Sequence, residues 1–178
     1  MDPNSIPRSV ADSGPVLRGF RRFGALVGRL SRAFGPVLAI AWYGLIFSLS
    51  AQPSPRLPGP ISGSWALNTG HSLIFGLLAL WMIVALPRNR GWPLIRRGSA
   101  AIVLGLVIVL GTLDELHQGG VPGRFMSATD VITDLTGAAC VLWICAYTSS
   151  ERAVERGLRQ RLALCIVACC AAGAFATL

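Results

Sequence analysis

The chain has 178 residues, of which 53% are hydrophobic and only 13% charged, with a formal net charge of +8. Soluble domains carry about 25% charged residues, so this composition excludes an ordinary soluble domain and indicates a membrane protein. A net positive charge is also typical of nucleic-acid binding, but here the arginines lie in short segments between apolar runs. That distribution is typical of membrane topology, and we expect no nucleic-acid partner.

The amino-terminal part divides into two segments. Residues 1–15 are polar and contain Pro and Gly, so we expect them to be disordered. They also lack the arrangement of a cleavable signal peptide. Residues 16–34 form a basic amphipathic pattern, with apolar residues on one half of a helical wheel and five arginines on the other. Two interpretations stay open: a helix in the lipid headgroup plane, or a cytoplasmic extension of the first spanning helix.

Five apolar runs predict five transmembrane helices, and hence an all-α bundle preceded by the basic amphipathic helix. Each is near the 17 to 25 residues, roughly, that cross a bilayer. They cover residues 36–51, 68–86, 98–116, 128–147 and 162–178. We expect the first four to form one membrane domain over residues 36–147. Residues 52–60, with four prolines, are predicted to be an exposed loop, and residues 148–161 a cytoplasmic turn before the fifth helix.

Arginine placement orients the predicted helices. Fourteen of the sixteen basic residues precede the first helix or lie in the second and fourth connections, against Arg56 and Arg124 on the other side. The positive-inside rule then predicts a cytoplasmic amino terminus and an extracytoplasmic carboxyl terminus.

Residues 114–134 are the candidate site. This stretch holds four of the eight acidic residues and one of the two histidines, between charge-free runs over 98–113 and 135–150. Polar groups in apolar surroundings are costly without partners or a task. The orientation also brings His71, on the second helix, to the same extracytoplasmic end.

Helical spacing predicts local partners within this stretch. Asp114, His117 and Gln118 lie at i, i+3 and i+4, so we expect them to share one side of a helix, with Asp114 orienting the imidazole. Asp130 and Asp134 repeat the i, i+4 spacing, and two such carboxylates repel each other unless a cation lies between them.

The loop between the third and fourth helices supplies further candidates. Arg124 is the obvious cation for the two aspartates. Ser127 opens an S-x-x-D pattern and is either the N-cap of the fourth helix or a ligand contact. The turn over residues 119–123 is glycine-rich, and it is either a simple reversal or an anion-binding turn.

These residues resemble the signature of the VanZ-like membrane proteins. In order along the chain, that signature is an acidic residue and His-Gln, followed by Pro-Gly-Arg, then Ser, Asp and Gly. The matching positions are Glu115 to Gln118 with Asp114, Pro122 to Arg124, Ser127, Asp130 and Gly137, and His71 matches an earlier histidine. The resemblance covers residues 42–147 and implies a role in the cell envelope. Asp134 stands where the family usually has Asn, and Leu67-Asn68 where it has Asp-Lys, so this site is more acidic.

Three functional hypotheses follow. The first is a binding site for an anionic envelope lipid or precursor, with Arg124, His71, His117, Gln118, Glu115 and Ser127 as ligand-binding residues. The second is an accessory subunit of a larger membrane complex, in which the polar residues only clip helix ends together. The third is an enzyme acting on a lipid-linked phosphate, with His117, Asp114, Asp130 and Asp134 as catalytic candidates. The spacing matches no metal signature, so we expect no metal or other cofactor.

Overall fold

The protein is described by a computed structural model over residues 14–53, 60–89 and 92–177. Six helices account for nearly all of this: α2 (Pro15–Val27), α3 (Phe34–Ser50), α4 (Pro60–Val84), α5 (Arg97–Gln118), α6 (Ala128–Thr148) and α7 (Glu155–Phe175). A two-residue antiparallel pair, β1 (Arg88–Asn89) and β2 (Trp92–Pro93), joins α4 to α5. The predicted loop over residues 52–60 and the predicted disorder over 1–15 lie mostly outside the described residues.

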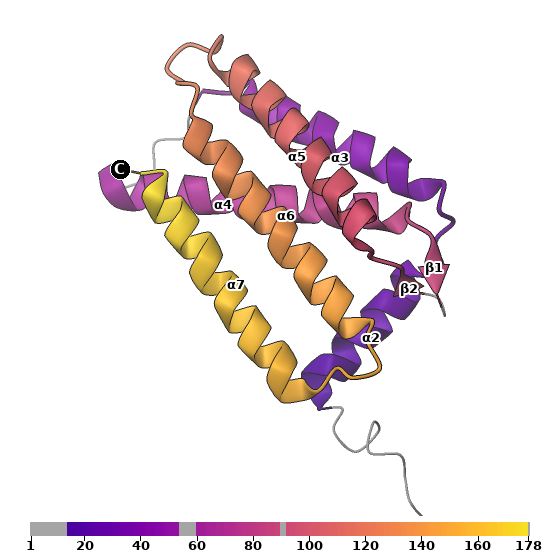
Figure 1. Ribbon diagram of the computed structural model, residues 1–178. Helices are drawn as coiled ribbons and strands as arrows, with labels where there is room; N and C mark the ends of the chain where they lie inside the picture. Colours follow the sequence, from indigo (N-terminus) through magenta and orange to yellow (C-terminus); the bar gives the residue numbers. More distant parts are fainter. Residues whose placement is uncertain (1–13, 54–59, 90–91, 178) are drawn as a thin grey trace, which may run out of the picture.

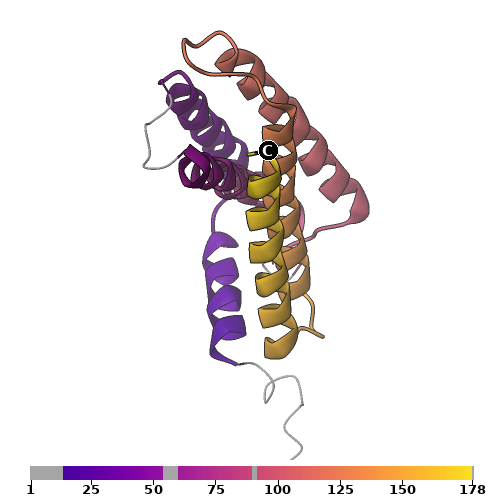
Figure 2. The same ribbon diagram turned by 90° about the vertical axis from the view of Figure 1, so that its left-hand side faces the viewer.

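The five helices α3 to α7 run alternately up and down, so that every second connection lies at the same end (Figure 1). Helix α4 crosses α6 and α7 obliquely, runs back along α3 at a shallower angle (Figure 1), and contacts α3, α5, α6 and α7. Viewed nearly end-on in Figure 2, it lies between α3 on one side and α6 and α7 on the other. The carboxyl ends of α3 and α5 and the amino ends of α4 and α6 therefore meet at one end of the bundle.

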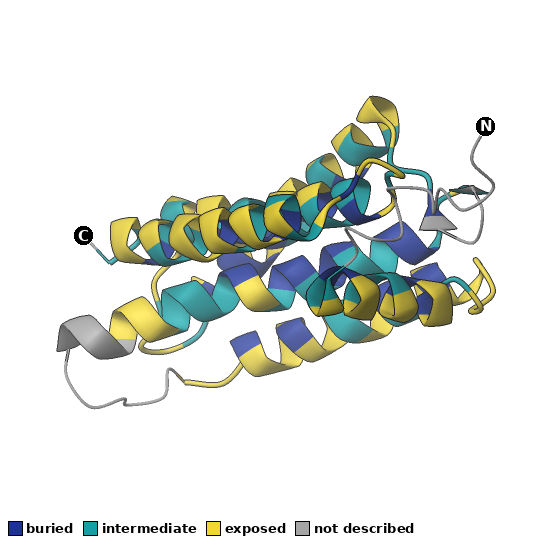
Figure 3. Cartoon of the chain, turned by 90° about the horizontal axis from the view of Figure 1, so that it is seen from below, coloured by how far each residue is buried: buried dark blue, intermediate teal, exposed yellow. Residues whose placement is uncertain are grey.

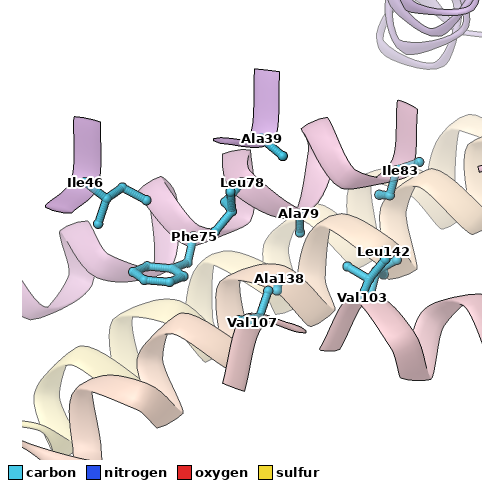
Figure 4. Close-up of a cluster of buried hydrophobic side chains, with 10 residues drawn as sticks. All are labelled: Ala39, Ile46, Phe75, Leu78, Ala79, Ile83, Val103, Val107, Ala138 and Leu142. Carbon is cyan, nitrogen blue, oxygen red and sulfur yellow. The ribbon is translucent and has the colours of Figure 1, made fainter. Parts of the chain in front are cut away.

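The core lies where α4 packs against α3, α5 and α6 (Figure 4). Phe75, Leu78 and Ala79 of α4 are fully buried, and they meet Ile46, Val107 and Ala138 of the neighbouring helices. The closest approach is at Gly137 of α6, where a Cβ atom would collide with the backbone carbonyl of Ser72. Only glycine permits that contact, which brings α4 and α6 backbone to backbone.

Within the described residues, four helices are long and apolar enough to cross a membrane: Ser64–Val84 within α4, then α5, α6 and α7. Helix α3 is also apolar but shorter, at 17 residues. Figure 3 shows buried residues where the helices meet and exposed ones along the outer faces. Those outer faces carry large apolar side chains such as Ile40, Leu73 and Ile166, as expected of helices that face lipid. The protein is thus an all-helical bundle with membrane-helix character.

Three helix boundaries differ from the sequence prediction. Helix α2 ends at Val27, because a turn beginning at Gly28 separates it from α3. Helix α4 begins at Pro60, well before the predicted start at residue 68. Helix α7 begins at Glu155, inside the predicted turn over 148–161, since Leu158 is buried against Leu17 of α2. Tertiary packing thus extends α7 beyond its apolar run.

Candidate functional site

The candidate site lies where the carboxyl ends of α3 and α5 and the amino end of α6 meet the middle of α4. Asp114 and Glu115 lie near the carboxyl end of α5, and Asp130 and Asp134 lie in the first turns of α6. Helix α4 contributes His71, and the carboxyl end of α3 contributes Ser50. The predicted gathering of these polar groups at one end is therefore present in the geometry. Their individual partners differ from those that helical spacing predicts.

Asp114 is fully buried and bonded through one oxygen. Its Oδ2 accepts hydrogen bonds from Ser50 Oγ at 2.9 Å and from Gln118 Nε2 at 2.7 Å. Its Oδ1 has no hydrogen-bond partner among the described residues. The i, i+4 partner of Asp114 is thus Gln118, and the bond from Ser50 ties α3 to α5.

Glu115 shows the same division between its two oxygens. Its Oε2 accepts the backbone N–H of Ser127 at 2.7 Å, which fastens the start of α6 to the end of α5. Its Oε1 is buried and, within the described part of the chain, has no partner. The carboxylate is therefore held by one oxygen and presents the other to the interior.

Asp134 repeats the pattern across α4 and α6. Its Oδ1 lies 3.2 Å from His71 Nδ1, and its buried Oδ2 lacks a partner in the described residues. Oδ2 is also the atom that a Cβ on Gly111 of α5 would approach, at 2.8 Å, so the glycine leaves room for it. Asp134, one of the departures from the family signature, thus pairs with the histidine that the signature shares.

His117 does not pair with Asp114. Its ring stacks on Phe47 of α3, with ring centroids 3.9 Å apart and planes inclined by 20°. Its Nε2 is buried, with no hydrogen-bond partner among the described residues. The Asp114–His117 acid/base pair predicted from spacing is thus not formed, because the ring of His117 lies against Phe47 while Asp114 is bonded to Gln118 and Ser50.

Arg124 sits at the rim of this cluster on the loop between α5 and α6. Its Nη1 donates to the backbone carbonyl of Ser50 at 3.0 Å, and its charge lies close enough to Asp130 to attract it. Asp130 is half-buried and also lies near the charge of His71. Arg124 therefore joins the loop to α3 and stands beside one of its two predicted partners.

Ser127 is the N-cap residue of α6 by position, as predicted, but its side chain does not cap the helix. Its Oγ instead lies 2.7 Å from Thr129 Oγ1, and its backbone N–H serves Glu115. Ser127 thus serves the site through its main-chain donor to Glu115, and its side chain also interacts with Asp130.

Two residues of the site escape sequence reasoning, Ser50 and Phe47. Both lie in an apolar run, and nothing in that run predicts a contact with α5. The Ser50–Asp114 bond joins residues that are 64 positions apart in the sequence. Ser50 has one weak signal, a hydroxyl at the end of an apolar helix. Phe47 has none.

One group in the cluster has the composition of a cation site. His71, Asp114 and Glu115 each offer one ligand atom, and these atoms lie within 4.8 Å of one another. Carboxylate oxygens and imidazole nitrogen are ligands for several divalent metals. The cluster thus combines buried carboxylates inside the bundle with one guanidinium at its rim.

A comparison with protein-family models matches residues 34–149 to the VanZ/LLP1 family. The match spans α3 to α6 and includes every residue of the cluster. Comparisons with curated proteins and with solved structures found no match. On the strength of the family match, which covers more than half of the chain, this protein belongs to the VanZ/LLP1 family.

Proposed function

We propose that the end of the bundle around Arg124 binds the anionic headgroup of a cell-envelope lipid or lipid-linked precursor, on the extracytoplasmic side of a bacterial inner membrane. In this proposal α3 is a fifth spanning helix, and α2 lies on the cytoplasmic surface. A 17-residue helix is about 25 Å long, slightly less than the hydrocarbon core of about 30 Å.

The observation that best supports headgroup binding is the composition of the loop around Arg124. Phe125 and Met126 follow it with 87% and 61% of their surfaces exposed, although both are large and apolar. Exposed apolar side chains at the end of a membrane bundle are suited to the boundary between headgroups and acyl chains. A guanidinium beside them would lie at the depth of lipid phosphates.

The chemistry of arginine supports an anionic ligand. Its planar guanidinium donates paired hydrogen bonds to phosphate or carboxylate oxygens, with greater strength than neutral donors have. The hydrogen bond from Nη1 to the Ser50 carbonyl holds the side chain at the rim. The opposite end carries most of the arginines, which the positive-inside rule assigns to the cytoplasm.

The structural hypothesis has an observation in its favour as well. The bonds from Ser50 to Asp114, from Ser127 to Glu115 and from His71 to Asp134 join four helices. Such a network clips helix ends together and suits an accessory subunit of a larger complex. The two proposals differ in the expected effect of substituting Arg124: headgroup binding predicts a loss of lipid affinity, whereas the structural role predicts a loss of stability.

Binding of a defined lipid tests the proposal. Native mass spectrometry of the full chain in detergent would follow titration with phosphatidylglycerol, with phosphatidylcholine as the neutral reference. We expect Arg124→Gln to weaken phosphatidylglycerol binding about tenfold or more, the loss of a charge-assisted hydrogen bond. The matched control is Arg97→Gln, an exposed arginine at the other end, which should bind as the parent does.

Equal affinity of the parent and Arg124→Gln for phosphatidylglycerol would contradict the headgroup proposal. If Arg124→Gln instead lowers the melting temperature without changing lipid affinity, the structural role is supported. Recovery of a stoichiometric partner after gentle purification would favour the accessory-subunit alternative.

A further inference from the structure

We infer that His71, Asp114 and Glu115 bind one divalent first-row metal ion, of the class of Mn²⁺ or Zn²⁺, inside the bundle. The site would lie between α4 and α5, close to the start of α6. It does not depend on lipid binding by Arg124, because all three ligands lie on the spanning helices and not on the loop. The absence of a metal signature in the sequence does not oppose it, since the ligands come from two helices.

The first argument is the pattern of hydrogen bonds on the carboxylates. Asp114, Glu115 and Asp134 expose 0%, 2% and 1% of their surfaces. Each uses one oxygen for a protein donor, and the other oxygen is buried with no partner among the described residues. A protein donor thus orients each of these three carboxylates. The second oxygen of each is a strong acceptor for which the described residues supply no hydrogen bond, and such an oxygen is costly in an apolar interior.

The second argument is distance. The ligand atoms of His71, Asp114 and Glu115 lie within 4.8 Å of one another. Two atoms that are each about 2.1 Å from one ion lie at most about 4.2 Å apart. Small side-chain rotations would therefore bring all three onto a single ion.

The third argument is the contact between His71 and Asp134. When Nδ1 donates its proton to Asp134 Oδ1, at 3.2 Å, the lone pair of the imidazole is on Nε2. A metal-binding histidine characteristically donates its other N–H to a carboxylate, which sets the tautomer and the ring orientation. Asp134 is then a positioning residue, while Ser50, Gln118 and the Ser127 N–H position the two carboxylate ligands.

The mixture of ligands selects the class of metal. Mg²⁺ and Ca²⁺ prefer all-oxygen coordination, whereas an imidazole with carboxylates suits Mn²⁺, Fe²⁺ or Zn²⁺. A divalent ion would also offset most of the negative charge of the three buried carboxylates, of which Glu115 and Asp134 lie near the half-buried His71.

The test uses the full chain in detergent, stripped with EDTA and then equilibrated with MnCl₂ or ZnCl₂. Elemental mass spectrometry should find about one ion per chain. At a hundredfold excess over the dissociation constant, the melting temperature should rise by about 5 to 10 °C. Glu115→Gln and Asp114→Asn should each reduce bound metal to background. The control Glu151→Gln, which changes an exposed carboxylate outside the cluster, should keep it.

Three results would overturn the inference: no metal on the parent protein, equal binding by Glu115→Gln and the parent, or equal protection by MgCl₂ and MnCl₂. Should the ligand variants fail to fold, Asp134→Asn decides, because its amide oxygen still accepts from His71. We expect this variant to fold by circular dichroism and to bind Mn²⁺ about 10- to 100-fold more weakly. Unchanged Mn²⁺ affinity in folded Asp134→Asn would refute the role given to His71.

Discussion

His71 of α4 and Asp134 of α6 lie in contact across the bundle, with Nδ1 and Oδ1 3.2 Å apart and the carboxylate almost fully buried. This pair lies next to the close approach of α4 and α6, because Gly137 brings the two helices together about one turn further along α6. The close packing of α4 on α6 and the His71–Asp134 pair are therefore neighbours in the fold. Substitutions at Gly137 and at the polar pair test the two features one at a time.

The buried pair itself predicts non-additive substitutions. His71→Leu leaves Asp134 buried without its partner, and should lower the free energy of unfolding in EDTA by about 3–5 kcal/mol. The double variant His71→Leu/Asp134→Leu removes both polar groups and should lose less than the sum of the single changes. Chemical unfolding in detergent measures both, and strict additivity would show that the contact contributes nothing.

The close approach of α4 and α6 predicts an effect of a single methyl group. Gly137→Ala places a Cβ against the Ser72 carbonyl and should destabilise the protein by about 1–3 kcal/mol, as overpacking does. Gly105→Ala is the matched control, because a Cβ there meets nothing within 4 Å. That change should stabilise α5 by up to about 1 kcal/mol through helix propensity. Equal melting temperatures of the two variants would contradict the packing described.

The proposed orientation predicts which loops face outward. Phe125→Cys replaces a residue that is 87% exposed and should react with a membrane-impermeant maleimide on spheroplasts. Arg152→Cys, an exposed position in the turn between α6 and α7, should react only after the membrane is opened. Both are compared with the parent, whose five cysteines lie within helices. The reverse labelling pattern would invert the topology.

The contact between α2 and α7 predicts a change in proteolysis. Glu155 accepts the backbone N–H of Leu17 at 2.8 Å and of Val16 at 3.3 Å, so it caps the first turn of α2. Glu155→Ala should loosen α2 and speed tryptic cleavage at the exposed Arg29 and Arg32. Glu151→Ala should leave the cleavage rate unchanged. Identical rates for both variants would mean that the other contacts of α2, such as the packing of Leu17 and the bond from Arg21 to the Ser150 carbonyl, hold it without Glu155.

Much of the architecture follows from sequence because apolar runs of membrane length are a strong signal. The starts and ends of α5 and α6 lie within two residues of prediction for that reason. The early start of α7 was not predictable from hydropathy, since a single buried residue, Leu158, secures its first turn.

The site divides in the same way. Helical spacing predicts which residues share a side of their own helix, and it placed Asp114 and Gln118 on one side of α5, where the structure shows them bonded. It does not predict how neighbouring helices rotate against each other. The contacts of Ser50 with Asp114 and of Phe47 with His117 depend on that rotation, which is why Asp114 has a different partner from the one predicted.

The proposed function requires that a lipid phosphate binds at the rim of the cluster, beside Arg124. A structure determined by electron microscopy in nanodiscs of phosphatidylglycerol would show whether it does. We expect headgroup density within hydrogen-bonding distance of the Arg124 guanidinium, with His71 and Asp134 still in contact beneath it. Ordered headgroups only around the arginines at the opposite end, with none at Arg124, would contradict it.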